Sequence, residues 1–260
     1  MLQWSALCAA LLGAGAAAAD DEAIVTDRPD FVESSNVVGR GVFQFETSVA
    51  AERGRRGADG ARTRTYSTPT LLRYGVSDTL ELRLETDGRL VERGGGNGNG
   101  NSSGYGDAAL GVKWHALDEA GGRPSLGFLL HADIDSGSAP FRGHGVRPSL
   151  RMAAEWELPD GYALGVMPGV FADRRDDGAR YGGAIFGIVL GKSWSERFRS
   201  FVELSAPRIA HGRDGGSVLT FDVGGAWLIG QRWQLDTALS RGLNRHTPDL
   251  SVTLGISGRY

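Results

Sequence analysis

The chain has 260 residues, with 28 Lys and Arg against 31 Asp and Glu, and a formal net charge of -3. This balance excludes a nucleic-acid partner bound through bulk positive charge. Glycine occurs 40 times and is spread along the chain, which is typical of many short strands joined by tight turns. The only cysteine is Cys8, so no disulfide is expected.

The N-terminus has the pattern of a secretory signal peptide. Residues 2–12 are largely apolar, residues 13–19 are Ala and Gly, and three acidic residues follow. The apolar run is shorter than the ~18 residues that a membrane-spanning helix requires. We therefore predict a signal peptide over residues 1–19, cleaved after Ala19, then an N-terminal segment over residues 20–40 and one domain over residues 41–260.

The domain consists of alternating polar and apolar runs. In the first run, Phe43 and Phe45 share one face while Gln44 and Glu46 share the other. Runs of about nine to twelve such residues match tilted strands that cross a bilayer. We predict strands beginning after Gly41 and then over residues 64–74, 80–90, 105–116, 125–134, 146–158, 162–172, 183–193, 199–210, 218–228, 233–243 and 249–260. The expected fold is all-β, a single antiparallel transmembrane barrel of about twelve strands.

The turn between the second and third predicted strands suggests a register. Pairing Tyr74 with Leu80 would set Arg73 opposite Glu81, with apolar residues facing outward. Long connections, including residues 53–62 and 91–104, alternate with short turns. Outer-membrane barrels have long outer loops and short periplasmic turns in this way.

Aromatic residues recur at one end of the predicted strands. They form an expected belt at the periplasmic membrane interface: Tyr74, Trp114, Trp156, Trp194, Trp227, Trp233 and Tyr260. The last run alternates and ends with Tyr260, as strands of outer-membrane barrels do. A soluble β-sandwich is the alternative, but it would not place every tryptophan of the domain beside a short turn.

The N-terminal segment contains the run Thr26-Asp27-Arg28-Pro29-Asp30-Phe31, followed by Glu33-Ser34, and Gln44-Phe45-Glu46 opens the first strand. Here the sequence resembles the family named for the meta pathway of phenol degradation, a family of outer-membrane transporter barrels. Val32 departs from the hydroxyl residue of that pattern. The resemblance implies a barrel with a transport function. Asp27, Arg28, Pro29 and Asp30 form a motif that either folds into the lumen or lies in the periplasm.

Charged and polar residues at inward positions are the candidates for lining the lumen. They are Glu46, Arg73, Glu81, Arg83, Glu85, Asp107, Lys113, His115, His131, Asp133, Arg147, Arg151, Glu155, Asp222 and Asp236. Both signs are present, so neither strong anion nor strong cation selectivity is expected. Twelve strands lie between the eight whose interior side chains can fill and the sixteen of open porins, which predicts a narrow path.

No motif for catalysis is evident. His131 and Asp133 share the inward face, but no nucleophile motif and no zinc motif accompany them. We therefore expect no enzyme, no metal and no cofactor. The predicted function is an outer-membrane channel for small solutes, hydrophobic or aromatic ones among them, that contacts outer-membrane lipids and is inserted by the barrel-assembly machinery. A lipid- or peptide-hydrolysing barrel and a closed structural barrel are the alternatives.

Overall fold

The computed structural model describes residues 23–56, 62–94 and 101–260. The predicted signal peptide and parts of the loops at 53–62 and 91–104 lie outside these residues. The described strands are β1 (Phe43–Arg56), β2 (Arg62–Ser67), β3 (Thr70–Gly75), β4 (Leu80–Thr86), β5 (Arg89–Arg93), β6 (Ser102–Tyr105), β7 (Ala108–Leu117), β8 (Ser125–Ile134), β9 (Arg147–Leu158), β10 (Tyr162–Arg174), β11 (Arg180–Ser195), β12 (Phe198–Ile209), β13 (Val218–Ile229), β14 (Trp233–Gly242) and β15 (Leu250–Arg259). Three single-turn 3-10 helices lie in connections: η1 (Ala139–Phe141), η2 (Pro159–Gly161) and η3 (Gly212–Asp214). Among the described helices, none is long and apolar enough to cross a membrane.

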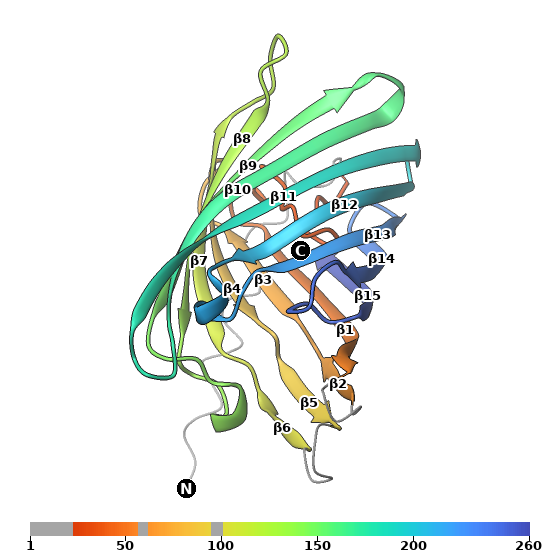
Figure 1. The fold of residues 1–260 in the computed structure, drawn as a ribbon. Helices are drawn as coiled ribbons and strands as arrows, with labels where there is room; N and C mark the ends of the chain where they lie inside the picture. The colour runs from red at the N-terminus through yellow and green to blue at the C-terminus, as the bar shows by residue number, and fades with distance from the viewer. Residues whose placement is uncertain (1–22, 57–61, 95–100) are drawn as a thin grey trace, which may run out of the picture.

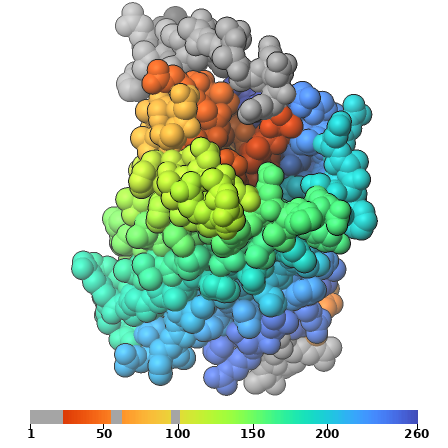
Figure 2. Space-filling view, turned by 90° about the horizontal axis from the view of Figure 1, so that it is seen from above, coloured from red at the N-terminus to blue at the C-terminus, as the bar shows by residue number. Residues whose placement is uncertain are grey.

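The strands form one closed antiparallel sheet. From β7 to β15 each strand pairs with the next one along the chain, while β1 pairs with β2 and β3, β3 with β4, β4 with β7, β2 with β5, and β5 with β6. The barrel closes where β15 pairs with β1, from Arg259 opposite Gln44 to Leu250 opposite Arg53. Figure 1 shows the strands tilted around a common axis, and in Figure 2 the strand colours succeed one another across the molecule. The predicted twelve-stranded antiparallel barrel is confirmed. Closure leaves no free sheet edge, which a hydrocarbon environment requires.

Three of the twelve spanning strands are each divided into two segments: β3 with β2, β4 with β5, and β7 with β6. Pro69 interrupts the first because it has no N–H to donate. Gly88 interrupts the second with a φ of 62°, a left-handed conformation that side chains disfavour. The three interruptions lie side by side, because the Thr68 N–H donates to the Asp87 carbonyl and the Gly106 N–H donates to the Gly88 carbonyl.

The predicted register between the second and third strands is wrong by two residues. Tyr74 pairs with Leu82, and Arg73 lies opposite Arg83. The turn takes up two more residues than expected, with the N–H of Val76 bonded to the Leu80 carbonyl. A shift of two keeps every side chain on its face. It also sets two like charges opposite each other, an arrangement that requires counter-charges nearby.

The barrel has charged side chains inside and apolar side chains outside, the reverse of a soluble protein. On β1, Glu46 is 0% exposed and Val49 is 59% exposed. The same pattern holds on β4, where Leu82 is exposed and Arg83 is buried. A closed barrel with an apolar outer face and a charged interior belongs in the bacterial outer membrane.

The seven aromatic residues of the predicted belt lie at strand positions that face outward. Six are exposed, and Trp156 is half-buried, with its indole N–H 3.2 Å from the Gly122 carbonyl oxygen. Trp233 and Tyr260 meet edge to face at 6.0 Å between ring centres. Phe198 adds to the rings by stacking on Trp227 at 4.7 Å. Their contact with the membrane interface stays a prediction.

The apolar outer face generates a stability prediction. Leu130 lies midway along β8, pairs with Val112 and Leu150, and is 56% exposed. Leu130→Arg places a charge against hydrocarbon and should cost about 2 to 4 kcal/mol of unfolding free energy. Urea titration of the folded barrel in liposomes measures this, with Leu130→Ala as the matched control. Equal losses in the two variants would contradict the assignment of this face to lipid.

Candidate functional site

Residues 24–42, which contain most of the predicted N-terminal segment, lie inside the barrel and are called the lumen segment below. Its start is held by the Ile24 N–H, 2.8 Å from the Gln231 carbonyl oxygen, in the turn between β13 and β14. Its end is held by the Gly41 N–H, 2.8 Å from the Gly75 carbonyl oxygen, at the turn after β3. The segment therefore enters and leaves at the short-turn end. Of the two placements expected for it, the structure has the lumenal one.

Asp27 is the centre of the contacts between the segment and the wall. Its carboxylate lies 2.6 Å from Arg83, 2.8 Å from Lys113 and 3.4 Å from Arg73. Burial alone would raise the pKa of Asp27, but the three positive charges hold that pKa well below its usual range. Asp27 is therefore ionised at neutral pH.

Two acids of the barrel wall share these bases. Glu46 accepts the Asp27 backbone N–H at 3.0 Å and lies 3.0 Å from the Arg73 guanidinium. Glu81 lies between the two opposed arginines, 2.9 Å from Arg73 and 2.8 Å from Arg83. The counter-charges that the register requires are thus supplied by Glu81 on the strand and by Asp27 on the segment.

Glu33 carries the contacts to the opposite end of the cluster. It lies 2.6 Å from Arg83 and 2.7 Å from Arg151. The resulting ion cluster contains four acids and four bases: Asp27, Glu33, Glu46, Glu81, Arg73, Arg83, Lys113 and Arg151. Its charges balance, which is the condition for burying so many of them.

The rest of the motif is bound by strands farther round the barrel. Arg28 lies 3.2 Å from Asp236 on β14, and Asp30 lies 3.3 Å from Arg199 on β12. Pro29 stands between them and follows a cis peptide bond. The three charged motif residues thus all contact inward-facing side chains.

The segment then passes close to β7, β8 and β9. The Ser35 N–H donates to Glu155 at 2.5 Å, and the Ser35 carbonyl oxygen lies 3.1 Å from His115. Gly127 allows this approach, because a Cβ there would lie 2.6 Å from the Ser35 carbonyl oxygen. A side chain at this position would push the segment away from the wall.

Other predicted lumen residues interact among themselves rather than with the segment. His131 lies 3.3 Å from Glu85, and Arg147 lies 2.7 Å from Asp107. Asp107 also accepts the N–H groups of Gly137 and Gly143 and so holds a long loop. Separately, Asp222 accepts hydroxyl hydrogen bonds from Ser205 and Thr220 on the β12 and β13 wall.

Two chambers lie at opposite ends of the barrel. One, of about 390 Å³, lies at the long-loop end, where Asp133, Glu85, His131, Arg147 and Asp173 are among its lining residues. The other, of about 420 Å³, lies at the short-turn end and is lined in part by the segment itself. The two chambers share no lining residue, and the segment lines only the short-turn one.

The model of the family described as "Putative MetA-pathway of phenol degradation" matches residues 26–260 of this chain. The chain belongs to this family. The resemblance carried by the Asp27-Arg28-Pro29-Asp30 motif is confirmed. Among proteins with curated descriptions, no sequence matches this chain.

Solved structures share the fold of this family member. An outer-membrane channel from Pseudomonas putida F1 is 15% identical, with a TM-score of 0.65 over 89% of this chain and 99% of that one. The β-domain of the Bordetella autotransporter BrkA is 12% identical, with a TM-score of 0.56 over 84% and 99%. The KdgM porin is 9% identical, with a TM-score of 0.51 over 84% and 98%. At these identities the likeness concerns the fold.

Several residues of the site were missed by the sequence analysis. Glu33 was recognised only as part of the motif, although it binds two arginines. Glu203 and Arg199 occupy inward positions of β12, and Glu203 accepts two backbone N–H groups of the segment. The alternation of that strand could have identified both. Within the described residues, no group of three or more His, Cys, Asp or Glu is placed to hold a metal ion.

The ion cluster predicts the effect of removing its central charge. Asp27→Asn leaves Arg73, Arg83 and Lys113 with fewer counter-charges and should cost about 3 to 5 kcal/mol of unfolding free energy. It should also loosen the segment, so that a Ser35→Cys thiol, buried in the native protein, reacts faster with a maleimide. Asp30→Asn is the matched control because its partner Arg199 is part-exposed. Equal maleimide labelling rates and equal unfolding free energies in the two variants would contradict the central role of Asp27.

The lowered pKa of Asp27 also predicts a pH dependence. Its contribution to stability is fully present above the pKa of an unfolded aspartate, about 4, and is lost as the pH falls through the lower folded-state pKa. The difference in unfolding free energy between the native protein and Asp27→Asn should therefore be constant from pH 7 to pH 5 and shrink below about pH 4. Urea titrations across this range measure it. A difference that shrank already between pH 7 and pH 5 would show that Asp27 is not held ionised.

Proposed function

We propose that this outer-membrane barrel is a channel for small solutes, hydrophobic or aromatic ones among them. The observation that carries the proposal is the pair of chambers, about 390 and 420 Å³, at opposite ends of one closed barrel. A barrel whose lumen was filled throughout by side chains would have no cavity of this size at either end. The lumen segment then divides one path into two parts rather than filling the barrel.

The size and lining of the chambers support small solutes. A cavity of about 150 Å³ suffices to hold benzene, so each chamber exceeds the volume of a one-ring compound. The long-loop chamber is mostly polar, whereas the short-turn chamber includes Val32, Leu164, Val189 and Leu228. A solute with an apolar ring and few polar groups can be accommodated in both.

The comparisons support transport. The family takes its description from phenol degradation, a process that consumes an aromatic compound. The Pseudomonas putida structure with the same fold is named an outer-membrane channel. The proposal includes lipid contacts around the apolar outer face and insertion by the barrel-assembly machinery. It assigns no reaction to the barrel, and His131, the residue considered for hydrolysis, contacts Glu85.

Transport and conductance test the proposal directly. Purified barrel in planar bilayers should give discrete KCl conductance steps, smaller than those of a sixteen-stranded porin because the segment narrows the lumen. Cells that lack their general porins should take up labelled toluene faster when they express the protein than when they carry the empty vector. Absence of both signals, together with hydrolysis of added phospholipid, would assign the barrel to the enzyme class instead.

A further inference from the structure

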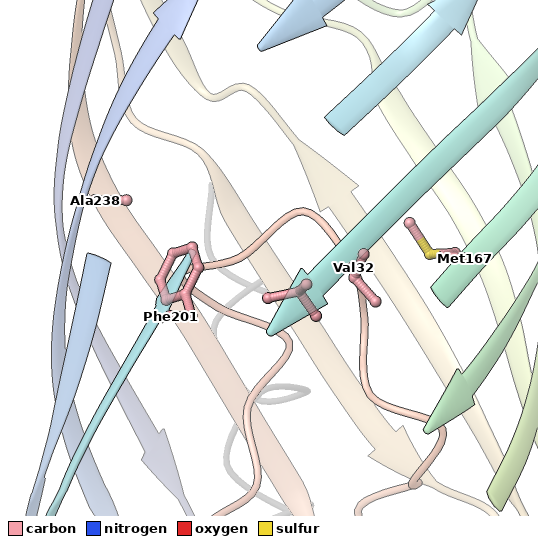
Figure 3. Packing of buried hydrophobic residues seen from close by; sticks show 5 residues of the cluster. Val32, Met167, Phe201 and Ala238 are labelled. Atoms are coloured by element: carbon pink, nitrogen blue, oxygen red, sulfur yellow. The ribbon is translucent and has the colours of Figure 1, made fainter. Parts of the chain in front are cut away.

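The lumen segment meets the wall through one apolar contact as well as through charges. Val32 packs with Met167, Val189, Phe201 and Ala238, all of them buried, and Met167 is 0% exposed. Figure 3 shows the loop that carries Val32 between the strand of Met167 on one side and Phe201 and Ala238 on the other. This apolar layer has no charged side chain among its members.

Two glycines of the wall, Gly165 and Gly187, face the methyl groups of Val32. A Cβ at Gly187 would lie 2.6 Å from one Val32 methyl group, and a Cβ at Gly165 would lie 3.1 Å from the other. Val32 therefore occupies a slot between β10 and β11 that two glycines create. The slot fits one branched side chain and leaves little space around it.

The attachments of the segment are unequal on its two sides. Toward β3, β4 and β7, Asp27 is held by three bases. Toward β12 and β14 the segment makes two single ion pairs, Asp30 with Arg199 and Arg28 with Asp236. Near Val32 itself, the backbone N–H groups of Phe31 and Val32 each donate to Glu203 at 2.8 Å, and the other contacts are those of the apolar layer. Breaking a buried ion cluster costs far more than separating apolar surfaces or exchanging two hydrogen bonds. The Val32 side is the side that can open.

The apolar layer lies between the two chambers. Val32, Gly165 and Val189 line the short-turn chamber, and Asp173, farther along β10, lines the long-loop chamber. Met167 lies between Gly165 and Asp173 on that strand and is fully buried. A solute that passes from one chamber to the other along β10 must cross the layer at Val32.

We propose that Val32, held in its slot by Glu203, is the gate of the channel and the point at which apolar solutes are selected over ions. The inference rests on the proposed transport function and adds the residue that decides what passes. An apolar solute that displaces Val32 replaces its contacts with Met167 and Val189 by equivalent ones. An ion at the same place would lose its water among the apolar side chains of the layer, which is costly, and the carboxylate beside Val32, that of Glu203, already accepts two backbone N–H groups.

Substitutions of Val32 test the gate, since this side chain lies outside the sheet and its replacement leaves the strand pairing intact. Val32→Asn should hydrate the layer, raise the KCl conductance in planar bilayers at least ten-fold and abolish the advantage in labelled toluene uptake over the empty vector. Val32→Ala widens the layer without making it polar, so toluene uptake should rise more than KCl conductance. Heat-modifiable migration in gels verifies that each variant is folded.

Glu203→Ala separately tests the two hydrogen bonds that hold Phe31 and Val32. Loss of both acceptors should shorten the closed intervals in single-channel records while the open-state conductance stays the same. Val37→Asn is the matched control, because Val37 belongs to the same segment but lies outside the apolar layer and is not among the residues that line either chamber. It should behave like the native protein in every assay.

The outcomes separate the gate from the channel itself. If the native protein transports toluene while both Val32 variants match it in conductance and uptake, the gate is elsewhere and this inference is wrong, although the channel stands. If Val37→Asn changes conductance as much as Val32→Asn does, the effect belongs to the segment as a whole, which also overturns it. If the native protein neither conducts nor transports, the proposed function falls and the gate with it.

Discussion

The pairing of β15 with β1 is the constraint on which the rest of the structure depends. In hydrocarbon, each backbone N–H or C=O without a partner costs several kcal/mol, so the sheet must close on itself. Closure directs alternate side chains into a lumen or into lipid. The buried Glu46 and the exposed Val49 of the same strand follow directly. A closed barrel thus obliges its interior to accommodate the charges that the strands carry.

The lumen segment neutralises the positive charges that closure of the barrel brings together. Arg73 and Arg83 face each other across β3 and β4, and Lys113 is buried beside them. Asp27 supplies a negative charge to all three, and Glu33 extends the cluster to Arg151. The segment is therefore part of the folded interior rather than an appendage. Because it is anchored mainly on one side, its other side, at Val32, is bound by weaker contacts.

The strands could be predicted almost completely, because each one must alternate along the full thickness of a bilayer. The prediction for residues 125–134 coincides with β8, and most other ends differ by one to three residues. The interruptions at Pro69 and Gly88 were not predicted, since either residue could equally have ended a strand. The register of Tyr74 was misjudged because turn length is not encoded in the alternation: shifts of two leave every face unchanged.

The sequence by itself determined the class of fold and, through the Asp27-Arg28-Pro29-Asp30 motif, the family. These properties are local, since a period of two and a short motif can be recognised without knowing any contact. Only the tertiary structure decided that the motif lies in the lumen, which bases surround Asp27, and that Val32 fits against Gly165 and Gly187. Those contacts join residues more than forty positions apart, and nothing in the spacing of a sequence specifies which inward-facing side chains meet across a closed barrel.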